Sequence, residues 1–122
     1  MKISITGQNG FIGSHLLNYL FYKTDDIEII DFKKSFFNDE KSLDKITSNA
    51  DVIVHLAGLN RNEDDKFLYK ENLRLTENLI SSIKRTNYKG KIIFASSIQE
   101  DSSSAYGKSK RDSSLKFQNN LK

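Results

Sequence analysis

The chain alternates between short apolar runs and longer stretches in which apolar residues recur every three or four positions. The short runs are rich in Ile and Val and predict strands at residues 3–6, 27–32, 51–56 and 91–95. The longer spacing predicts helices: one from Phe11, a short one around Leu43 and Ile46, a long one over 65–87, and a last one from near Ala105. Strands and helices therefore take turns along the chain.

This alternation predicts the α/β class, with a Rossmann-like doubly wound parallel sheet in truncated form, of about four to five strands. We expect one domain over residues 1–122, with helices on both faces of the sheet. A functional site is expected at the carboxyl ends of the strands. The usual strand between Asp31 and Asp51 is at best vestigial, because that stretch is polar and mixed.

The last predicted helix has the weakest apolar face. After Tyr106, only Leu115, Phe117 and Leu121 are clearly apolar. A helix that packs on a sheet needs a broader apolar face. We therefore expect the residues from about 113 onward to fray or to depend on a partner.

Composition excludes several classes of function. The chain has 122 residues, 19 Lys and Arg against 16 Asp and Glu, and a net charge of +3. The basic residues are spread out, which indicates a solvated surface and no nucleic-acid partner. Cysteine is absent, which excludes disulfides and thiolate metal sites, and we expect no metal. No apolar run is long enough for a bilayer and the first strand leaves no room for a signal peptide, so we expect a cytoplasmic protein without membrane contact.

Three glycines lie between the first predicted strand and the first predicted helix. Gly7 suits a tight turn, Gly10 lets the backbone approach a pyrophosphate, and Gly13 lets the helix pack closely on the strand. The N–H groups at the helix start then face the phosphates. This pattern predicts NAD or NADP binding. A P-loop is excluded, because the loop carries no Gly-Lys-Ser/Thr at the helix start.

Asp31 lies near the end of the second predicted strand, where an acidic residue can bind the adenosine ribose hydroxyls. A carboxylate there favours NAD, because it repels a 2′-phosphate. Lys33 and Lys34 follow closely and can offset that repulsion. NAD binding, NADP binding and a surface Asp therefore stay open as interpretations.

Ser97, Tyr106 and Lys110 form a candidate catalytic group. Tyr106 and Lys110 are four residues apart and share one helix face. A free phenol is a poor acid–base catalyst at neutral pH, but a nearby ammonium favours the phenolate. The pattern predicts proton transfer between Tyr106 and a sugar oxygen, with Ser97 hydrogen-bonded to the same oxygen, while a nicotinamide exchanges a hydride.

The two histidines carry less information. His15 lies on the first helix and His55 near the end of a buried strand, and we interpret both as structural residues. The spacing supports neither a metal-ligand cluster nor a Ser-His-Asp triad.

Taken together, these residues resemble the extended short-chain dehydrogenase/reductase family, the NAD-dependent epimerases and dehydratases of nucleotide sugars. The resemblance runs over nearly the whole chain, with the motifs in the family's order and spacing. The matching pieces are residues 6–13 (TGQNGFIG), 55–58 (HLAG), Asn72, Ser96-Ser97, and 106–110 (YGKSK).

The resemblance implies roles for particular residues. Ser97, Tyr106 and Lys110 are implied as catalytic, with Lys110 also holding the nicotinamide ribose. Gly7, Gly10 and Gly13 would cradle the pyrophosphate, Asp31 would meet the adenosine ribose, and Ala57 and Gly58 would line the nicotinamide side. The remaining cofactor contacts implied in this way are Asn9, Phe11, Ile12, Lys33, Leu56 and Asn72.

A narrower resemblance is to the reductases of UDP-4-keto-6-deoxy-sugars that supply UDP-N-acetyl-L-fucosamine for bacterial capsule and O-antigen. It rests on residues 55–61 (HLAGLNR), on 96–99 (SSIQ), and on Tyr106 lying only nine residues after Ser97. Most relatives have a longer segment between the Ser and the Tyr. Members of this subgroup favour NADPH, which conflicts with Asp31.

Family members continue beyond the position of Lys110 with further strands and the segment that binds the nucleotide sugar. We therefore expect the 122-residue chain alone to give no useful turnover. It is either a reductase fragment, completed by a C-terminal half or within a homodimer, or an inert truncated module that binds the dinucleotide. Epimerase or dehydratase chemistry is the alternative within the enzyme class. A dehydratase needs acidic residues just after the Ser, and Gln99 and Glu100 leave that alternative weak but open.

Overall fold

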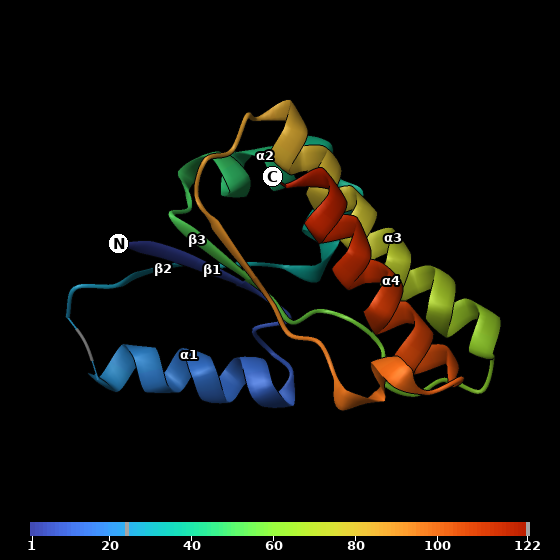
Figure 1. Cartoon of the computed structure of the whole chain (residues 1–122). Helices are drawn as coiled ribbons and strands as arrows, with labels where there is room; N and C mark the ends of the chain where they lie inside the picture. Colours follow the sequence, from blue (N-terminus) through green and yellow to red (C-terminus); the bar gives the residue numbers. More distant parts are fainter. Residues whose placement is uncertain (24, 122) are drawn as a thin grey trace. The chain divides into compact units, whose positions relative to one another are not determined.

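The elements of the fold are a set of parallel strands with helices between them (Figure 1). The computed structural model describes residues 1–23 and 25–121. In chain order the elements are β1 (Lys2–Thr6), α1 (Phe11–Lys23), β2 (Glu28–Ile30), the 3-10 helix η1 (Lys34–Asn38), α2 (Glu40–Asn49), β3 (Val52–His55), α3 (Asp65–Arg85), β4 (Lys91–Phe94), the 3-10 helix η2 (Ile98–Asp101) and α4 (Ala105–Asn120).

The four strands form one parallel sheet in the order β2-β1-β3-β4. Ile5 pairs with Val54, and His55 pairs with Phe94. The predicted α/β class and Rossmann-like sheet are confirmed. Within the described residues, the segment between β2 and β3 holds η1 and α2 and adds no strand, as expected.

The second strand is shorter than the predicted 27–32, because its last residues leave the strand ladder. β2 ends at Ile30, and the N–H of Phe32 donates to the side-chain oxygen of Gln8 at 2.9 Å. The Gln8 side chain thus accepts the hydrogen bond that a neighbouring strand would otherwise accept from Phe32.

The chain divides into two compact units. The first contains Met1–Ala57 and Ser82–Ala95, and therefore the whole sheet with α1 and α2. The second contains Gly58–Ser81 and the chain from Ser96, and therefore most of α3 with η2 and α4. No helix in the described residues has the length and apolar character needed to cross a membrane.

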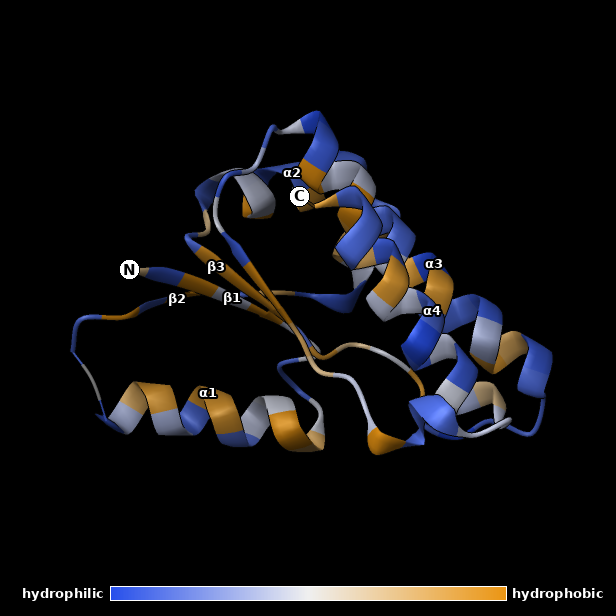
Figure 2. Ribbon diagram, in the orientation of Figure 1, coloured by the Kyte–Doolittle hydropathy of each residue, from blue (hydrophilic) through white to orange (hydrophobic). Residues whose placement is uncertain are grey.

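In the first unit, α1 covers one face of the sheet. The buried residues there are Ile3, Ile5 and Val54, and Leu16 and Leu20 of α1 pack against them. In Figure 2 the strand β3 is largely in the hydrophobic colour, and β1 alternates between hydrophobic and polar colours. Burying a side chain of this size contributes roughly 1.5–3 kcal/mol, so this layer is a main source of stability for the unit.

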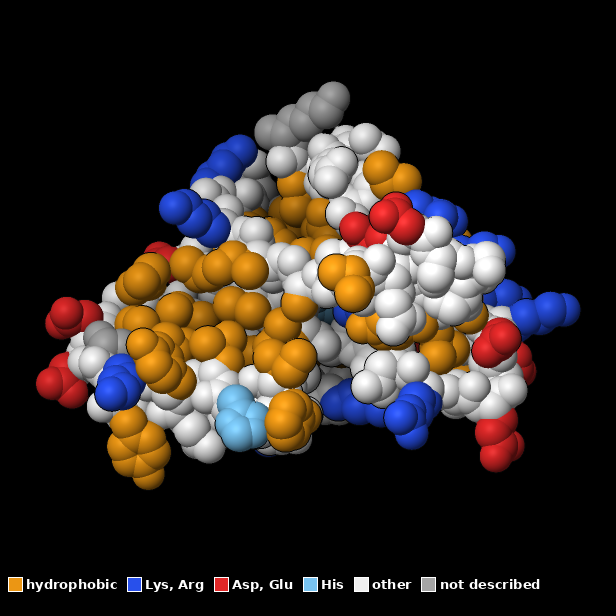
Figure 3. Space-filling view, turned by 60° about the horizontal axis from the view of Figure 1, so that its bottom comes forward, with side chains coloured by type: hydrophobic (Ala, Val, Ile, Leu, Met, Phe, Trp, Pro, Cys, Tyr) orange, Lys and Arg blue, Asp and Glu red, His pale blue; other side chains and the backbone are white. Residues whose placement is uncertain are grey.

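The same side of the unit also exposes apolar side chains. Ile93 of β4 pairs with Val54 in register and is 53% exposed. On α1, Phe21 and Tyr22 are 72% and 80% exposed. Figure 3, which brings this side forward, shows hydrophobic side chains gathered on the surface. One helix therefore does not cover this face of the sheet completely.

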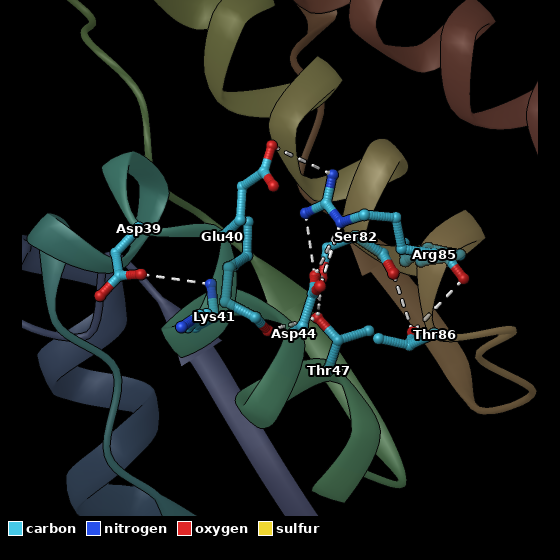
Figure 4. Close-up of polar contacts among 10 residues, drawn as sticks. Asp39, Glu40, Lys41, Asp44, Thr47, Ser82, Arg85 and Thr86 are labelled. Carbon is cyan, nitrogen blue, oxygen red and sulfur yellow. Dashed lines mark hydrogen bonds and ion pairs between the residues drawn. The ribbon is translucent and has the colours of Figure 1, made fainter.

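A polar network joins α2 to the C-terminal end of α3 (Figure 4). Asp44 receives hydrogen bonds from Arg85 Nε and Nη2 at 3.0 and 2.9 Å, and from the Ser82 hydroxyl at 2.7 Å. The hydroxyls of Ser82 and Thr47, both fully buried, lie 2.9 Å apart. The Arg85 hydrogen bond, with that of Ser82, holds the pKa of Asp44 below its usual value.

In the second unit, α4 packs on α3 through hydroxyl groups. Ser109 and Ser113 are buried, and their hydroxyls lie 3.0 Å from Asn72 Nδ2 and Thr76 Oγ1. With Phe117 they form a buried stripe at four-residue spacing.

Of the two expectations for the residues from about 113 onward, fraying is wrong, because α4 continues to Asn120, and dependence on a partner stays a prediction. The apolar pattern missed this helix face, since serines make up much of it.

We expect Asp44→Ala to lower the free energy of unfolding by about 1 kcal/mol at pH 7, because it removes hydrogen bonds from Arg85 and Ser82. A carboxyl whose pKa is lowered by folding stabilises the native state above its unfolded pKa, near 4, and loses this contribution as the pH falls through the folded value. Urea titrations should therefore show the difference from the native chain shrinking below about pH 4. A difference independent of pH would contradict the assignment, and Asp25→Ala, an exposed carboxylate, is the control.

Candidate functional site

The loop between β1 and α1 is a tight turn built on glycines. Gly7 has φ +75°, and its carbonyl accepts the N–H of Gly10 at 3.0 Å. A side chain at Gly13 would place its Cβ 2.0 Å from the same carbonyl. Only glycine fits that position. The absence of a side chain at Gly13 therefore allows the first turn of α1 to lie close to the end of β1.

The start of α1 suits a phosphate group. Phe11, Ile12 and Gly13 form its first turn, where backbone N–H groups have no acceptor within the helix. Asn9 and Gly10 are exposed, and the side chains of Phe11 and Ile12 are 81% and 65% exposed. The loop therefore fits the diphosphate of a dinucleotide, which would lie on open N–H groups at the positive end of a helix.

The carboxyl ends of β1 and β3 are joined by the Thr6 hydroxyl. It accepts the N–H groups of Leu56 and Ala57, each at 3.1 Å, and lies 2.8 Å from Nδ1 of His55. Because its oxygen receives two donors, its proton goes to His55. The imidazole then carries its own proton on Nε2.

The burial of His55 supports the structural role predicted for it, whereas the role of the exposed His15 stays a prediction. His55 is 1% exposed, stacks on Phe94 with ring centroids 5.8 Å apart, and has Phe37 edge-on at 6.1 Å. His15 is exposed on α1 and contacts the ring of Phe11 at 4.7 Å.

Asp31 follows β2, and its partner is the side chain of Gln8. The Gln8 amide nitrogen donates to Asp31 Oδ1 at 2.6 Å. Lys33, the residue before η1, is exposed, as is Lys34. The first unit thus contains the glycine loop and Asp31, together with Leu56 and Ala57.

In the second unit, Asn72 organises the segment after Gly58. Its Oδ1 accepts the N–H of Leu59 at 2.6 Å, and its Nδ2 donates to the Leu59 carbonyl at 2.8 Å and to Ser109 at 3.0 Å. A Cβ at Gly58 would lie 3.0 Å from Asn72 Oδ1. These bonds use both N–H groups of a buried amide, so they support a structural role for Asn72, and its cofactor contact stays a prediction.

Tyr106 and Lys110 meet on α4. The Lys110 ammonium lies 5.6 Å from the centre of the Tyr106 ring, within cation–π range. Burial lowers the pKa of Lys110, because desolvation disfavours its charged form.

Ser97 precedes η2 and caps it, its hydroxyl oxygen accepting the N–H of Gln99 at 3.1 Å. The hydroxyl proton of Ser97 is thereby left to donate elsewhere. Gly107 brings η2 and α4 together, since a Cβ there would lie 2.0 Å from the Gln99 carbonyl.

An open pocket of about 620 Å³ lies beside Tyr106 in the second unit. Most of the residues that line it carry amide, hydroxyl or charged groups, although apolar atoms contribute much of its surface. The lining residues are Asn60, Arg61, Asn62, Glu63, Asp65, Leu68, Gln99, Ser104, Ala105 and Tyr106. No cluster of His, Asp or Glu in residues 1–23 and 25–121 could hold a metal ion.

Sequence reasoning missed Thr6, Gln8 and the 60–65 segment of the pocket. Thr6 and Gln8 flank Gly7, and a polar residue beside a strand end was the available signal. Their partners lie 23 to 51 residues away, which spacing does not reveal.

Comparison with known proteins gives one family. Residues 3–120 match the NAD dependent epimerase/dehydratase family. The chain is 32% identical to UDP-2-acetamido-2,6-beta-L-arabino-hexul-4-ose reductase of Pseudomonas aeruginosa, over 91% of this chain and 29% of that protein. It is 31% identical to D-erythronate dehydrogenase of Haemophilus influenzae, over 80% of this chain and 38% of that protein. The chain thus spans about a third of the length of these relatives.

Solved structures show the same fold. RMD from Pseudomonas aeruginosa complexed with NADPH has a TM-score of 0.80 at 22% identity, over 97% of this chain and 49% of that one. The capsular polysaccharide assembling protein CapF from Staphylococcus aureus has a TM-score of 0.75 at 29% identity, over 98% of this chain and 30% of that one.

We expect Thr6→Val to lower the free energy of unfolding by about 2 kcal/mol, because it keeps the branched shape but leaves the Ala57 N–H and His55 Nδ1 without their partner. Thr6→Ser retains the hydroxyl and should lose less than about 1 kcal/mol. Urea titration measures both. Equal losses in the two variants would mean that the hydroxyl contributes little.

The stability that Lys110 contributes should rise with pH. The pKa of Lys110 is lower in the folded state, so the unfolded chain binds the proton more tightly, and stability rises until both states are deprotonated, near pH 10. The stability of Lys110→Met relative to the native chain should therefore fall as the pH approaches about 10 in urea titrations. Lys108→Met, at an exposed lysine of α4, is the control. A difference between Lys110→Met and the native chain that is independent of pH would refute the prediction.

Proposed function

Because this chain belongs to the NAD dependent epimerase/dehydratase family, we propose that it forms part of a reductase acting on a UDP-4-keto-6-deoxy-hexose. The observation that carries the proposal is the Tyr106–Lys110 pair beside a pocket lined by amide, hydroxyl and charged residues, with the Ser97 hydroxyl in the same unit. A phenol with a nearby ammonium and a hydroxyl donor is a set suited to protonating a carbonyl oxygen.

The proposed residue roles follow from these contacts. Ser97 accepts a backbone N–H, so its own proton can be donated to the keto oxygen at C4. Tyr106 gives its phenolic proton to that oxygen as the carbonyl becomes an alcohol, and later regains a proton from solvent. Lys110 stabilises the phenolate in between. The reduced nicotinamide supplies the hydride when it is bound.

The diphosphate and the adenosine ribose of the dinucleotide would be held by residues of the first unit. The glycine loop, with Asn9, Phe11 and Ile12, would take the diphosphate, and Asp31 with Lys33 would lie at the adenosine ribose. Leu56, Ala57, Gly58 and Asn72 are the proposed contacts on the nicotinamide side, with Lys110 at the nicotinamide ribose.

The choice of substrate rests on three observations. The pocket is lined by amides and a hydroxyl, groups that match the donors and acceptors of a sugar ring. Tyr106 lies only nine residues after Ser97, as in the resemblance to the UDP-4-keto-6-deoxy-sugar reductases, whereas most relatives have a longer segment there. The chain is 32% identical to a reductase whose printed substrate is a UDP-linked hexul-4-ose. Synthesis of a surface polysaccharide is the process that this substrate and the CapF likeness favour.

Epimerase and dehydratase chemistry are the competing activities. A dehydratase uses carboxylates just after the serine position, whereas here the pocket receives the Gln99 amide from that segment. An epimerase would return the dinucleotide to its starting oxidation state. The balance of reduced dinucleotide therefore separates the activities.

The test is a turnover assay of the protein in its natural full length, with NADH or NADPH and a UDP-4-keto-6-deoxy-hexose. We expect one reduced dinucleotide to be consumed per C4 alcohol formed. Tyr106→Phe should reduce kcat by about 100-fold or more, because it removes the proton donor. Tyr22→Phe, at an exposed tyrosine of α1, should keep native activity. A C4 epimer formed without net consumption of reduced dinucleotide would refute the reductase proposal.

A further inference from the structure

Gln8 is a buried polar residue that the proposed chemistry does not use. It lies in the middle of the glycine loop and is 8% exposed. Its side chain is directed to the end of β2, where it bonds with two successive residues, Asp31 and Phe32. A buried amide at a proposed phosphate loop, engaged with the residue proposed for the ribose, indicates a link between the two subsites.

The orientation of the Gln8 amide is fixed by chemistry. The Phe32 N–H is a donor, so the Gln8 oxygen must face it, at 2.9 Å. The amide nitrogen then faces Asp31 Oδ1, at 2.6 Å, and a carboxylate is an acceptor. Phe32 is itself 3% exposed and packs edge-on against Phe36 and Phe37. Phe32, whose N–H holds the Gln8 side chain in place, is therefore part of the hydrophobic core.

The partner of Asp31 leaves its charge in place. A lysine paired with this carboxylate would cancel most of its charge, but an amide donates a hydrogen bond without neutralising it. Asp31 is exposed, so its charge acts on whatever binds there. With one oxygen bonded to Gln8, the carboxylate keeps its other oxygen for a ribose hydroxyl and cannot swing away from an approaching phosphate.

We infer that Gln8 is a positioning residue which, by fixing Asp31, makes the chain select NAD over NADP. The inference rests on dinucleotide binding by the glycine loop, which is part of the proposed function. Gln8 acts through Asp31 and makes no contact with the dinucleotide in this role. Lys33 and Lys34 follow Asp31 in the chain and are exposed. They reduce the preference for NAD over NADP, because their positive charges attract a 2′-phosphate.

The test is calorimetric titration of the chain with ADP-ribose and with its 2′-phosphate, which differ only at the group in question and do not depend on the nicotinamide side. We expect the native chain to bind ADP-ribose at least about 10-fold more tightly, a difference of about 1.4 kcal/mol. Asp31→Asn should bring this ratio close to one, because it keeps an acceptor for Gln8 but removes the charge.

Gln8→Met keeps the size of the side chain and removes both hydrogen bonds. We expect it to reduce the ratio by about threefold or more in the native background, and to leave it unchanged in the Asp31→Asn background, because coupled residues are not additive. Gln8→Asn, whose amide is one methylene too short to bond both partners, is the second variant if Gln8→Met does not fold.

Three results would overturn the inference. They are a native preference for the 2′-phosphate, an equal loss of affinity for both ligands in the Gln8 variants, and an effect on the ratio that persists without the Asp31 charge. The turnover assay is independent of all three, so the reductase proposal can survive any of them. Failure of both ligands to bind would overturn this inference and the dinucleotide-binding part of the proposed function together.

Discussion

The hydroxyl of Thr6 holds the carboxyl ends of the two central strands together, and the geometry of the glycine loop depends on it. By accepting two consecutive N–H groups from the end of β3, it fixes Ala57 beside Gly7, where a Cβ would lie 2.9 Å from the Ala57 nitrogen. Parallel strands have no tight turn to set their ends in register, so a side chain performs this task here. The same hydroxyl orients His55 in the core.

Hydroxyl and amide groups recur as packing elements in both units. The hydroxyls of Thr47 and Ser82 meet between α2 and α3, and those of Ser113 and Thr76 meet between α4 and α3. Small polar side chains let backbones approach closely, but each needs a partner to offset its desolvation. The Ser4 hydroxyl is the exception among the described residues, buried without a hydrogen bond. Packing of this kind fixes the geometry of a site more tightly than apolar contacts, because each bond specifies a direction.

Much of the fold could be predicted from the sequence, because β-branched runs and helical spacing marked every strand and most helices within a few residues. The glycine loop was recognisable because its three glycines lie between a strand and a helix. The packing face of α4 was not, since its serines look like surface residues until their partners Asn72 and Thr76 are known. The pairing of Gln8 with Asp31 was hidden for the same reason. A hydrogen bond between residues far apart leaves no periodic signal in one sequence.

The apolar character of β4 affects how this polypeptide behaves while it folds. Its residues Ile92, Ile93 and Phe94 are all apolar, and Ile93 is 53% exposed. Until it is paired in its sheet, such a strand is a template for another extended chain, including the same strand of a second copy. Lys91 is the charged residue of the strand and opposes such pairing.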